Sequence, residues 1–204
     1  MEFLACLLVL GLILMSGSSA ASDLCGDYRQ AHDYLNPAHR ERLLRVVEEF
    51  HFTEDIKMLR RGRGAALGAD LSYTLRHFPN HHEALYAMVR YAVREGTEKP
   101  PHSDFTMDCW FTRAKTINRN DDVVWLIEGI YHQRKGRNQD AVASLTQALA
   151  LNEWNAETHY NLGITLFRLG EYQQALERAK DAYSLGYPLP GLRRMLEAAG
   201  HWED

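Results

Sequence analysis

Two consecutive stretches of equal length decide the fold: DVVWLIEGIYHQRKGRNQDAVASLTQALALNEWN at 122–155 and AETHYNLGITLFRLGEYQQALERAKDAYSLGYPL at 156–189. Aligning the first stretch with the second places small residues on small residues: Gly129 on Gly163, Gly136 on Gly170, Ala141 on Ala175 and Ala148 on Ala182. A period of this length with small residues at fixed offsets is typical of a helix–turn–helix repeat. Repeats of this kind build a binding surface and rarely carry chemistry. We therefore predict an all-α helical solenoid with a binding function.

Each stretch contains a first helix, a glycine and a second helix that carries alanines at regular spacing. Two helices approach closely only where the facing side chains are small, and bulky replacements would overpack the pair at a cost of about 1–3 kcal/mol. We therefore assign one set of residues to the fold alone: Trp125, Gly129, Ala141, Gly163 and Ala175.

The flanking sequence extends this arrangement on both sides. Asn36-Pro37 favours a helix start, with the asparagine as cap and the proline in the first turn. The segment GTEKPPHS at 96–103 predicts a loop, because its glycine and two prolines interrupt the helical pattern. The expected organisation is a signal peptide at 1–20, an N-terminal arm and helices at 21–64, degenerate repeats at 65–121, two repeats at 122–155 and 156–189, and a capping helix at 190–204.

The second stretch resembles the tetratricopeptide repeat family. It carries Tyr160-Asn161-Leu162-Gly163, Leu169-Gly170-Glu171-Tyr172, Ala175 and Ala182 at the family's positions. The first stretch keeps Trp125, Gly129, Gly136, Ala141 and Ala148 but departs at Asn138, where the family prefers an aromatic residue, and at Glu153, where it prefers proline. About three repeats are expected, the first of them degenerate.

The resemblance implies stacked helix pairs whose first helices line a concave groove that holds a protein or peptide. Seven residues map to that groove: Leu126, Ile130, Arg134, Tyr160, Ile164, Phe167 and Arg168. Leu126 and Ile130 replace the basic and amide residues with which some relatives bind a C-terminal carboxylate. An apolar groove with arginines at its edge better suits an amphipathic helix or an extended apolar segment. The alternative is a structural protein whose groove is already filled by its own capping helix or N-terminal arm.

The N-terminus predicts export. Phe3 to Met15 is an unbroken apolar run, and the small residues Ser18 and Ala20 fit cleavage before Ala21. The run is too short to cross a bilayer comfortably, so the mature chain is expected to lack a membrane span. No Lys or Arg precedes it, so an uncleaved membrane anchor is the alternative. The expected location is the bacterial periplasm, within a cell-envelope assembly, with the endoplasmic reticulum lumen as the alternative compartment.

Export would leave two cysteines, Cys25 and Cys109. In an oxidising compartment they can form a disulfide that ties the N-terminal arm to the middle of the domain. Two separate buried thiols are the other interpretation.

The remaining features argue against nucleic-acid binding and offer little support for catalysis. The formal charge is −4, whereas nucleic-acid binders normally present a strongly basic face. The sequence has no GxSxG motif, and no cofactor is expected. His77, His81 and His82 form a cluster that could serve a metal-dependent enzyme, the second hypothesis. Because Pro79 interrupts the helix that would align them, we predict no metal site.

Overall fold

The computed structural model describes residues 25–64 and 66–202, and the predicted signal peptide lies outside these ranges. All regular secondary structure in the described ranges is helical, which confirms the all-α prediction. The elements are α2 (Pro37–His39), a π-helical turn η1 (Arg40–Leu44), α3 (Arg45–His51), α4 (Glu54–Lys57), α5 (Leu67–His77), α6 (His82–Glu95), α7 (Met107–Ile117), α8 (Asp122–Arg134), α9 (Asn138–Leu151), α10 (Ala156–Arg168), α11 (Tyr172–Ser184) and α12 (Gly191–Ala198).

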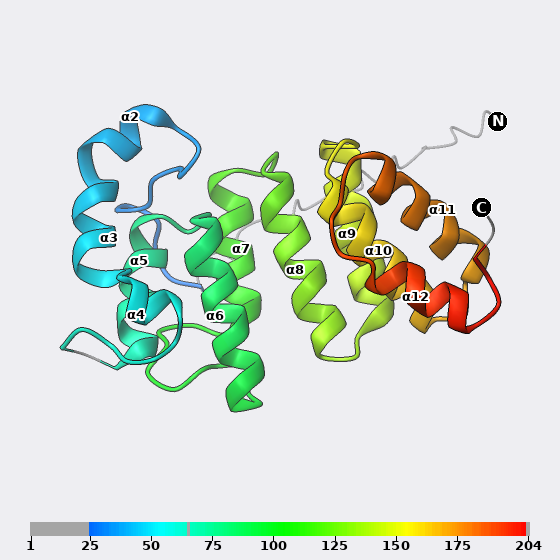
Figure 1. Cartoon of the computed structure of the whole chain (residues 1–204). Helices are drawn as coiled ribbons and strands as arrows, with labels where there is room; N and C mark the ends of the chain where they lie inside the picture. The colour runs from blue at the N-terminus through cyan, green and yellow to red at the C-terminus, as the bar shows by residue number, and fades with distance from the viewer. Residues whose placement is uncertain (1–24, 65, 203–204) are drawn as a thin grey trace, which may run out of the picture.

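The helices form consecutive antiparallel pairs, α6/α7, α8/α9 and α10/α11, with α5 before them and α12 after them (Figure 1). Helix α8 contacts α6, α9 and α10, so it lies at the centre of the stack. Glycines in the left-handed conformation end the first helices of the last two pairs, with φ 74° at Gly136 and 82° at Gly170. Only glycine adopts this conformation readily, which explains why the two glycines recur at the period of the repeat.

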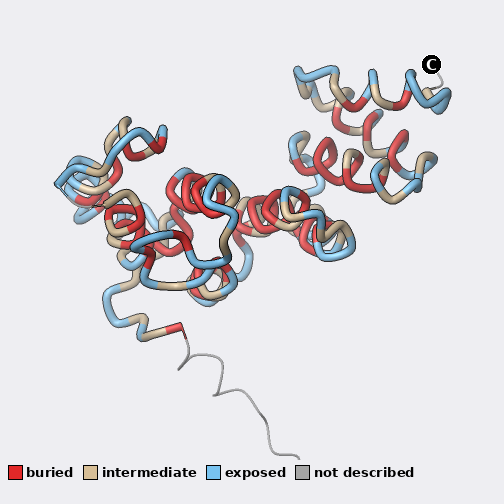
Figure 2. Tube along the Cα trace, turned by 90° about the horizontal axis from the view of Figure 1, so that it is seen from below, coloured by how far each residue is buried: buried red, intermediate tan, exposed pale blue. Residues whose placement is uncertain are grey.

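Two hydrophobic cores meet at α8. Its side chains Val124, Ile127 and Tyr131 belong to the N-terminal core, which extends back to α4 and α5. Leu126 and Ile130, on another side of the same helix, belong to the C-terminal core formed with α9 to α12. In Figure 2 buried positions recur along each helix on the sides where helices face one another. Because α8 contributes to both cores, it couples the two parts of the solenoid.

The N-terminal arm is fastened to α7. The structure forms the disulfide between Cys25 and Cys109, whose Cα atoms are 5.2 Å apart. Nearby, Arg113 is 2% exposed, and its Nη1 donates to the carbonyl oxygens of Cys25 (2.7 Å) and Asp27 (2.9 Å). Burial lowers the pKa of Arg113. These contacts hold the start of the arm against α7.

The loop at 96–103 is packed tightly against its neighbours. A Cβ atom on Gly68, at the start of α5, would lie only 2.1 Å from the carbonyl oxygen of Pro101. Ser103 is buried and its hydroxyl accepts a hydrogen bond from Trp110 Nε1 at 3.0 Å. Glu98 accepts a hydrogen bond from the Tyr131 hydroxyl, and this bond lowers the pKa of the Glu98 carboxyl. The loop is therefore part of the folded scaffold.

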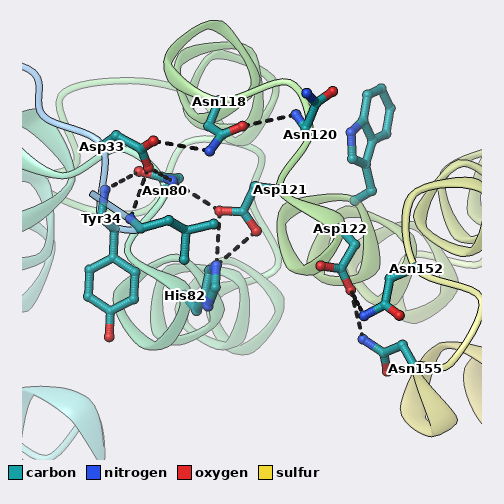
Figure 3. Close-up of polar contacts among 12 residues, drawn as sticks. Asp33, Tyr34, Asn80, His82, Asn118, Asn120, Asp121, Asp122, Asn152 and Asn155 are labelled. Carbon is teal, nitrogen blue, oxygen red and sulfur yellow. Dashed lines mark hydrogen bonds and ion pairs between the residues drawn. The ribbon is translucent and has the colours of Figure 1, made fainter. Parts of the chain in front are cut away.

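Amide and carboxylate side chains connect the turns between helix pairs (Figure 3). The fully buried Asn80 donates from Nδ2 to Asp33 at 2.8 Å and to Asp121 at 2.9 Å. Its Oδ1 accepts from the backbone N–H of Tyr34 at 2.9 Å. Asn118 also donates to Asp33, at 3.0 Å. The arm is thus held at two places, by the disulfide and by this network.

The next turn repeats the arrangement. The Asp122 carboxylate accepts hydrogen bonds from Asn152 at 3.1 Å and from Asn155 at 3.0 Å (Figure 3). Asn155 also caps α10, because its Oδ1 accepts from the backbone N–H of Thr158 at 3.1 Å. The two bonds to Asp122 join the start of one helix pair to the turn that begins the next.

We expect Asn80→Ala to lower the free energy of unfolding by about 2–4 kcal/mol, because it removes two hydrogen bonds to the Asp33 and Asp121 carboxylates and leaves the backbone N–H of Tyr34 without its acceptor. Chemical denaturation followed by circular dichroism measures the change. Asn120→Ala is the matched control, since Asn120 is exposed in the neighbouring turn and should change stability by less than about 0.5 kcal/mol. Equal effects of the two substitutions would contradict the role given to Asn80.

Candidate functional site: a groove between three first helices

The seven predicted groove residues lie on α8 and α10, but they differ in exposure. Leu126, Ile130 and Tyr160 are only 3%, 6% and 8% exposed and contribute to the C-terminal core. Ile164 and Phe167 are half-buried, and the two arginines are exposed. Part of the predicted set therefore supports the fold as well as the concave face.

A groove of about 290 Å³ lies on this face, with α8 between α6 and α10. Its apolar floor comes from α8, and its polar walls come from the first turns of α6 and α10. The lining residues are His82, Glu83, Tyr86, Val123, Leu126, Ile127, Ile130 and Glu157. The structure thus assigns Leu126 and Ile130 to the floor of a groove and adds residues that the sequence did not identify.

His82, Glu83 and Tyr86 of α6 line the groove but were not predicted from the sequence. The sequence nevertheless contains a pattern that places this helix in a repeat. The shift that places Gly96 on Gly136 also places Tyr86 on Leu126. Gly96 has φ 66°, the same left-handed conformation as Gly136. Helix α6 is therefore the first helix of a repeat whose period is lengthened by the loop at 96–103.

The two predicted arginines reach toward neighbouring helices. Arg134 donates from Nη2 to the Tyr86 hydroxyl at 2.7 Å, and its guanidinium lies 5.3 Å from the centre of the Tyr86 ring. Arg168 reaches the carbonyl oxygen of Gln133 at 3.4 Å. Gln133 itself donates to the hydroxyl of Thr165 at 2.9 Å, which ties α8 to α10. The two arginines are the last residues of α8 and α10, so both lie at the same end of the concave face.

The C-terminal segment of the chain covers the other predicted residues. The rings of Tyr160 and Tyr187 are 4.3 Å apart, and a Cβ on Gly191 would lie 2.6 Å from the Tyr160 hydroxyl. A Cβ on Gly163 would lie 2.4 Å from Leu192 of α12. The part of α10 around Tyr160 and Gly163 is therefore covered by the chain itself.

Phe167 is tied to the same C-terminal segment. Its ring lies 5.2 Å from Tyr172, which stacks on His201 at 4.0 Å. Phe167 is not among the residues that line the groove.

The charges on this face are unevenly distributed. Glu83 and Glu157 lie in the first turns of α6 and α10, whereas Arg134 and Arg168 lie in the last turns of α8 and α10. Glu83 forms an ion pair with Lys57. Within residues 25–64 and 66–202, Glu157 has no cationic side chain at ion-pair distance. Glu157 is exposed, and partial desolvation raises the pKa of its carboxyl.

The histidine cluster serves the packing of the N-terminal helices. His81 is fully buried, accepts a hydrogen bond from the backbone N–H of Ala84 through Nδ1 and lies 3.1 Å from Glu48 through Nε2. His82 lies 2.9 Å from the Asp121 carboxylate, and His77 packs on Tyr73 at 4.6 Å. Among the described residues, no three His, Cys, Asp or Glu side chains are arranged to hold a metal ion.

The helices of the solenoid are too short or too polar to span a membrane. No helix within 25–64 and 66–202 has the length and apolar character needed to cross a bilayer.

Known proteins share this architecture. The family model for the TPR repeat matches residues 130–170. One crystal structure of MamA superposes with a TM-score of 0.54 at 17% identity, covering 76% of this chain and 82% of MamA. A second MamA structure gives a TM-score of 0.50 at 19% identity, covering 66% and 78%. At these identities the likeness shows a shared helical-repeat fold.

Curated sequences match less than half of this chain. The peroxisomal targeting signal receptor of Kluyveromyces lactis is 32% identical over 80 residues, which are 39% of this chain and 14% of the receptor. The BBSome complex member BBS4 homolog of Drosophila melanogaster is 26% identical over 104 residues, 44% of this chain and 21% of that protein. The chain thus spans a small part of these relatives. Residues 130–170 thus match the TPR repeat family, and the chain as a whole shares the helical-repeat fold of MamA.

Proposed function

We propose that this protein is a protein–protein interaction scaffold, not an enzyme, and that it holds a segment of its partner in the groove between α6, α8 and α10. The observation that carries the proposal is the groove itself, about 290 Å³ with an apolar floor and polar walls. A groove of this kind suits an amphipathic helix or extended segment that places its apolar side chains on the floor. Val123, Leu126 and Ile130 would contact that segment from below, and Tyr86 from the side.

The alternative is that the chain occupies its own groove, and the segment that covers Tyr160 is relevant to it. The segment at 187–191 and α12 lie over α10, whereas the lining of the groove comes mainly from α6 and α8. The described part of the N-terminal arm bonds mainly near the α5 and α7 ends, as in the 2.8 Å bond from His32 N–H to the His77 carbonyl. Its Tyr34 also packs against His82 at the start of α6, with ring centres 5.3 Å apart, so the arm borders one end of the groove. The proposal therefore places the partner between α6 and α8, upstream of the site that the sequence favoured.

We further propose that the protein is exported and works in an oxidising compartment, the bacterial periplasm, within a cell-envelope assembly. The disulfide between Cys25 and Cys109 supports such a compartment, because thiols in the cytosol are kept reduced. An uncleaved N-terminal anchor is the alternative to cleavage before Ala21. Mass spectrometry of the N-terminal peptide from native cells distinguishes the two, since cleavage gives a chain that begins at Ala21.

The groove is tested with Val123→Arg, which adds a charge to a half-buried side chain on the groove lining. Peptides selected from a displayed library of random sequences serve as ligands, and their dissociation constants are measured by fluorescence polarisation. We expect Val123→Arg to weaken binding at least about tenfold, because it places a charge where an apolar side chain should lie.

Val142→Arg is the matched control, because Val142 is also half-buried but lies on α9, outside the groove. We expect it to leave the affinity unchanged and both variants to keep their helical circular dichroism. If both substitutions weaken binding equally, or neither does, the partner does not bind in this groove.

A further inference from the structure

We propose that the groove selects a segment carrying a lysine or arginine, and that this cationic side chain is anchored by Glu157 at the acidic end of the groove. The inference rests on the proposed function and specifies the chemistry of the partner.

The first observation is the position of Glu157. It lines the groove from the first turn of α10, across the α8 floor from Glu83 and Tyr86 on α6. An apolar segment lying on Leu126 would therefore place a side chain near the carboxylate. The segment needs only one long polar side chain at this end to contact it.

The second observation is that the carboxylates around this position already have partners, whereas Glu157 does not. Glu83 is paired with Lys57, Asp121 lies 2.9 Å from His82, and Asp122 accepts from two asparagines. Within the described residues no arginine, lysine or histidine comes within ion-pair distance of Glu157. Glu157 is exposed and therefore open to a partner, and partial desolvation raises the pKa of its carboxyl, a cost that a neighbouring cation would offset.

The third observation is the aromatic surroundings. Tyr160 lies one turn after Glu157 on α10, and its ring is 4.3 Å from that of Tyr187. Burial and the negative charge of Glu157 raise the pKa of Tyr187 to about 12. Lysine and arginine place their alkyl chains on apolar and aromatic surfaces while the charged group reaches a carboxylate.

The charged residues beyond the opposite end of the groove determine which way round the bound segment lies. Arg134 and Arg168 lie where α8 and α10 end, and they repel a second cation there. The occupant that fits both ends has an apolar face, a basic side chain near Glu157 and no basic side chain near the arginines.

The test compares selected peptides on the wild-type protein and on Glu157→Gln, which keeps the shape of the side chain and removes its charge. The backbone bond that Asn161 donates to the carbonyl oxygen of residue 157 at 2.9 Å does not involve the side chain, so the variant should fold normally. We expect lysine or arginine at one fixed position of the selected peptides. Replacing it by glutamine should weaken binding to the wild type about tenfold and to Glu157→Gln less than about twofold.

Glu177→Gln on the exposed face of α11 is the matched control and should retain the full tenfold difference. Peptides that lose affinity with Val123→Arg but need no basic residue would overturn this inference and leave the groove function intact. If no selected peptide is sensitive to Val123→Arg, the groove function is wrong and the inference falls with it.

Discussion

Gly129→Leu is expected to unfold the α8/α9 pair, with a loss of at least about 3 kcal/mol in the free energy of unfolding. A Cβ at this position would lie 2.5 Å from Cγ of Leu145 and 3.4 Å from the Ala141 carbonyl oxygen on the facing helix. Leu145 is fully buried, so it cannot move aside into solvent. Because α8 contributes to both cores, the damage should spread beyond one repeat.

The effect is measured by thermal and chemical denaturation followed by circular dichroism. Ala143→Leu adds the same side chain to an exposed position on α9 and should change stability by less than about 0.5 kcal/mol. The clash is tested by combining Gly129→Leu with Leu145→Ala. The double variant should have a higher free energy of unfolding than the sum of the two single changes predicts. Strict additivity would mean that the two side chains do not compete for the same space.

Removal of the disulfide by Cys25→Ser together with Cys109→Ser is expected to cost about 2–4 kcal/mol. The bond joins residues separated by 84 positions, so it restricts a long loop in the unfolded chain. Arg113 and the Asn80 network still hold the arm in the variant, so we expect a less stable protein with the same fold.

Urea denaturation of the wild type with and without reductant gives the same comparison without mutation. Reductant should lower the wild-type midpoint to that of the double variant and leave the variant unchanged. A wild-type midpoint that does not respond to full reduction, verified by mass spectrometry, would show that the bond contributes no stability.

The repeats could be predicted from the sequence because their small residues are required by close contacts. Gly129 and Gly163 face Leu145 and Leu192 at distances that no side chain could tolerate, so the period of the repeat is visible without a structure. The left-handed glycines Gly136 and Gly170 mark the helix ends for a separate backbone reason.

The third wall of the groove was harder to predict. The longer loop at 96–103 lengthens the period of this repeat, so Tyr86 and Glu83 did not align with the groove positions of the later repeats. The alignment of Gly96 with Gly136 was the one available signal. Sequence periodicity identifies individual repeats. A groove that several repeats form together is predicted in full only when all of those repeats are recognised.

Contacts between distant segments could not be predicted from periodicity. Tyr187 covers Tyr160 because the chain turns back after α11, and that path depends on the turn at 185–190. The bond between Asp33 and Asn80 joins residues 47 positions apart, and neither residue lies in a repeated pattern. Such contacts decide which part of the concave face is covered.

The most direct test of the central claim is photo-crosslinking in the native compartment from a benzoylphenylalanine at position 86, where Tyr86 lines the groove. The control probe stands at Trp154, an aromatic residue that is 72% exposed in the turn between α9 and α10. We expect a defined peptide of one partner protein crosslinked from position 86, lost in the Val123→Arg variant and absent from position 154. Crosslinks from position 86 only to this chain, or partner crosslinks from position 154 alone, would contradict a groove that holds another protein.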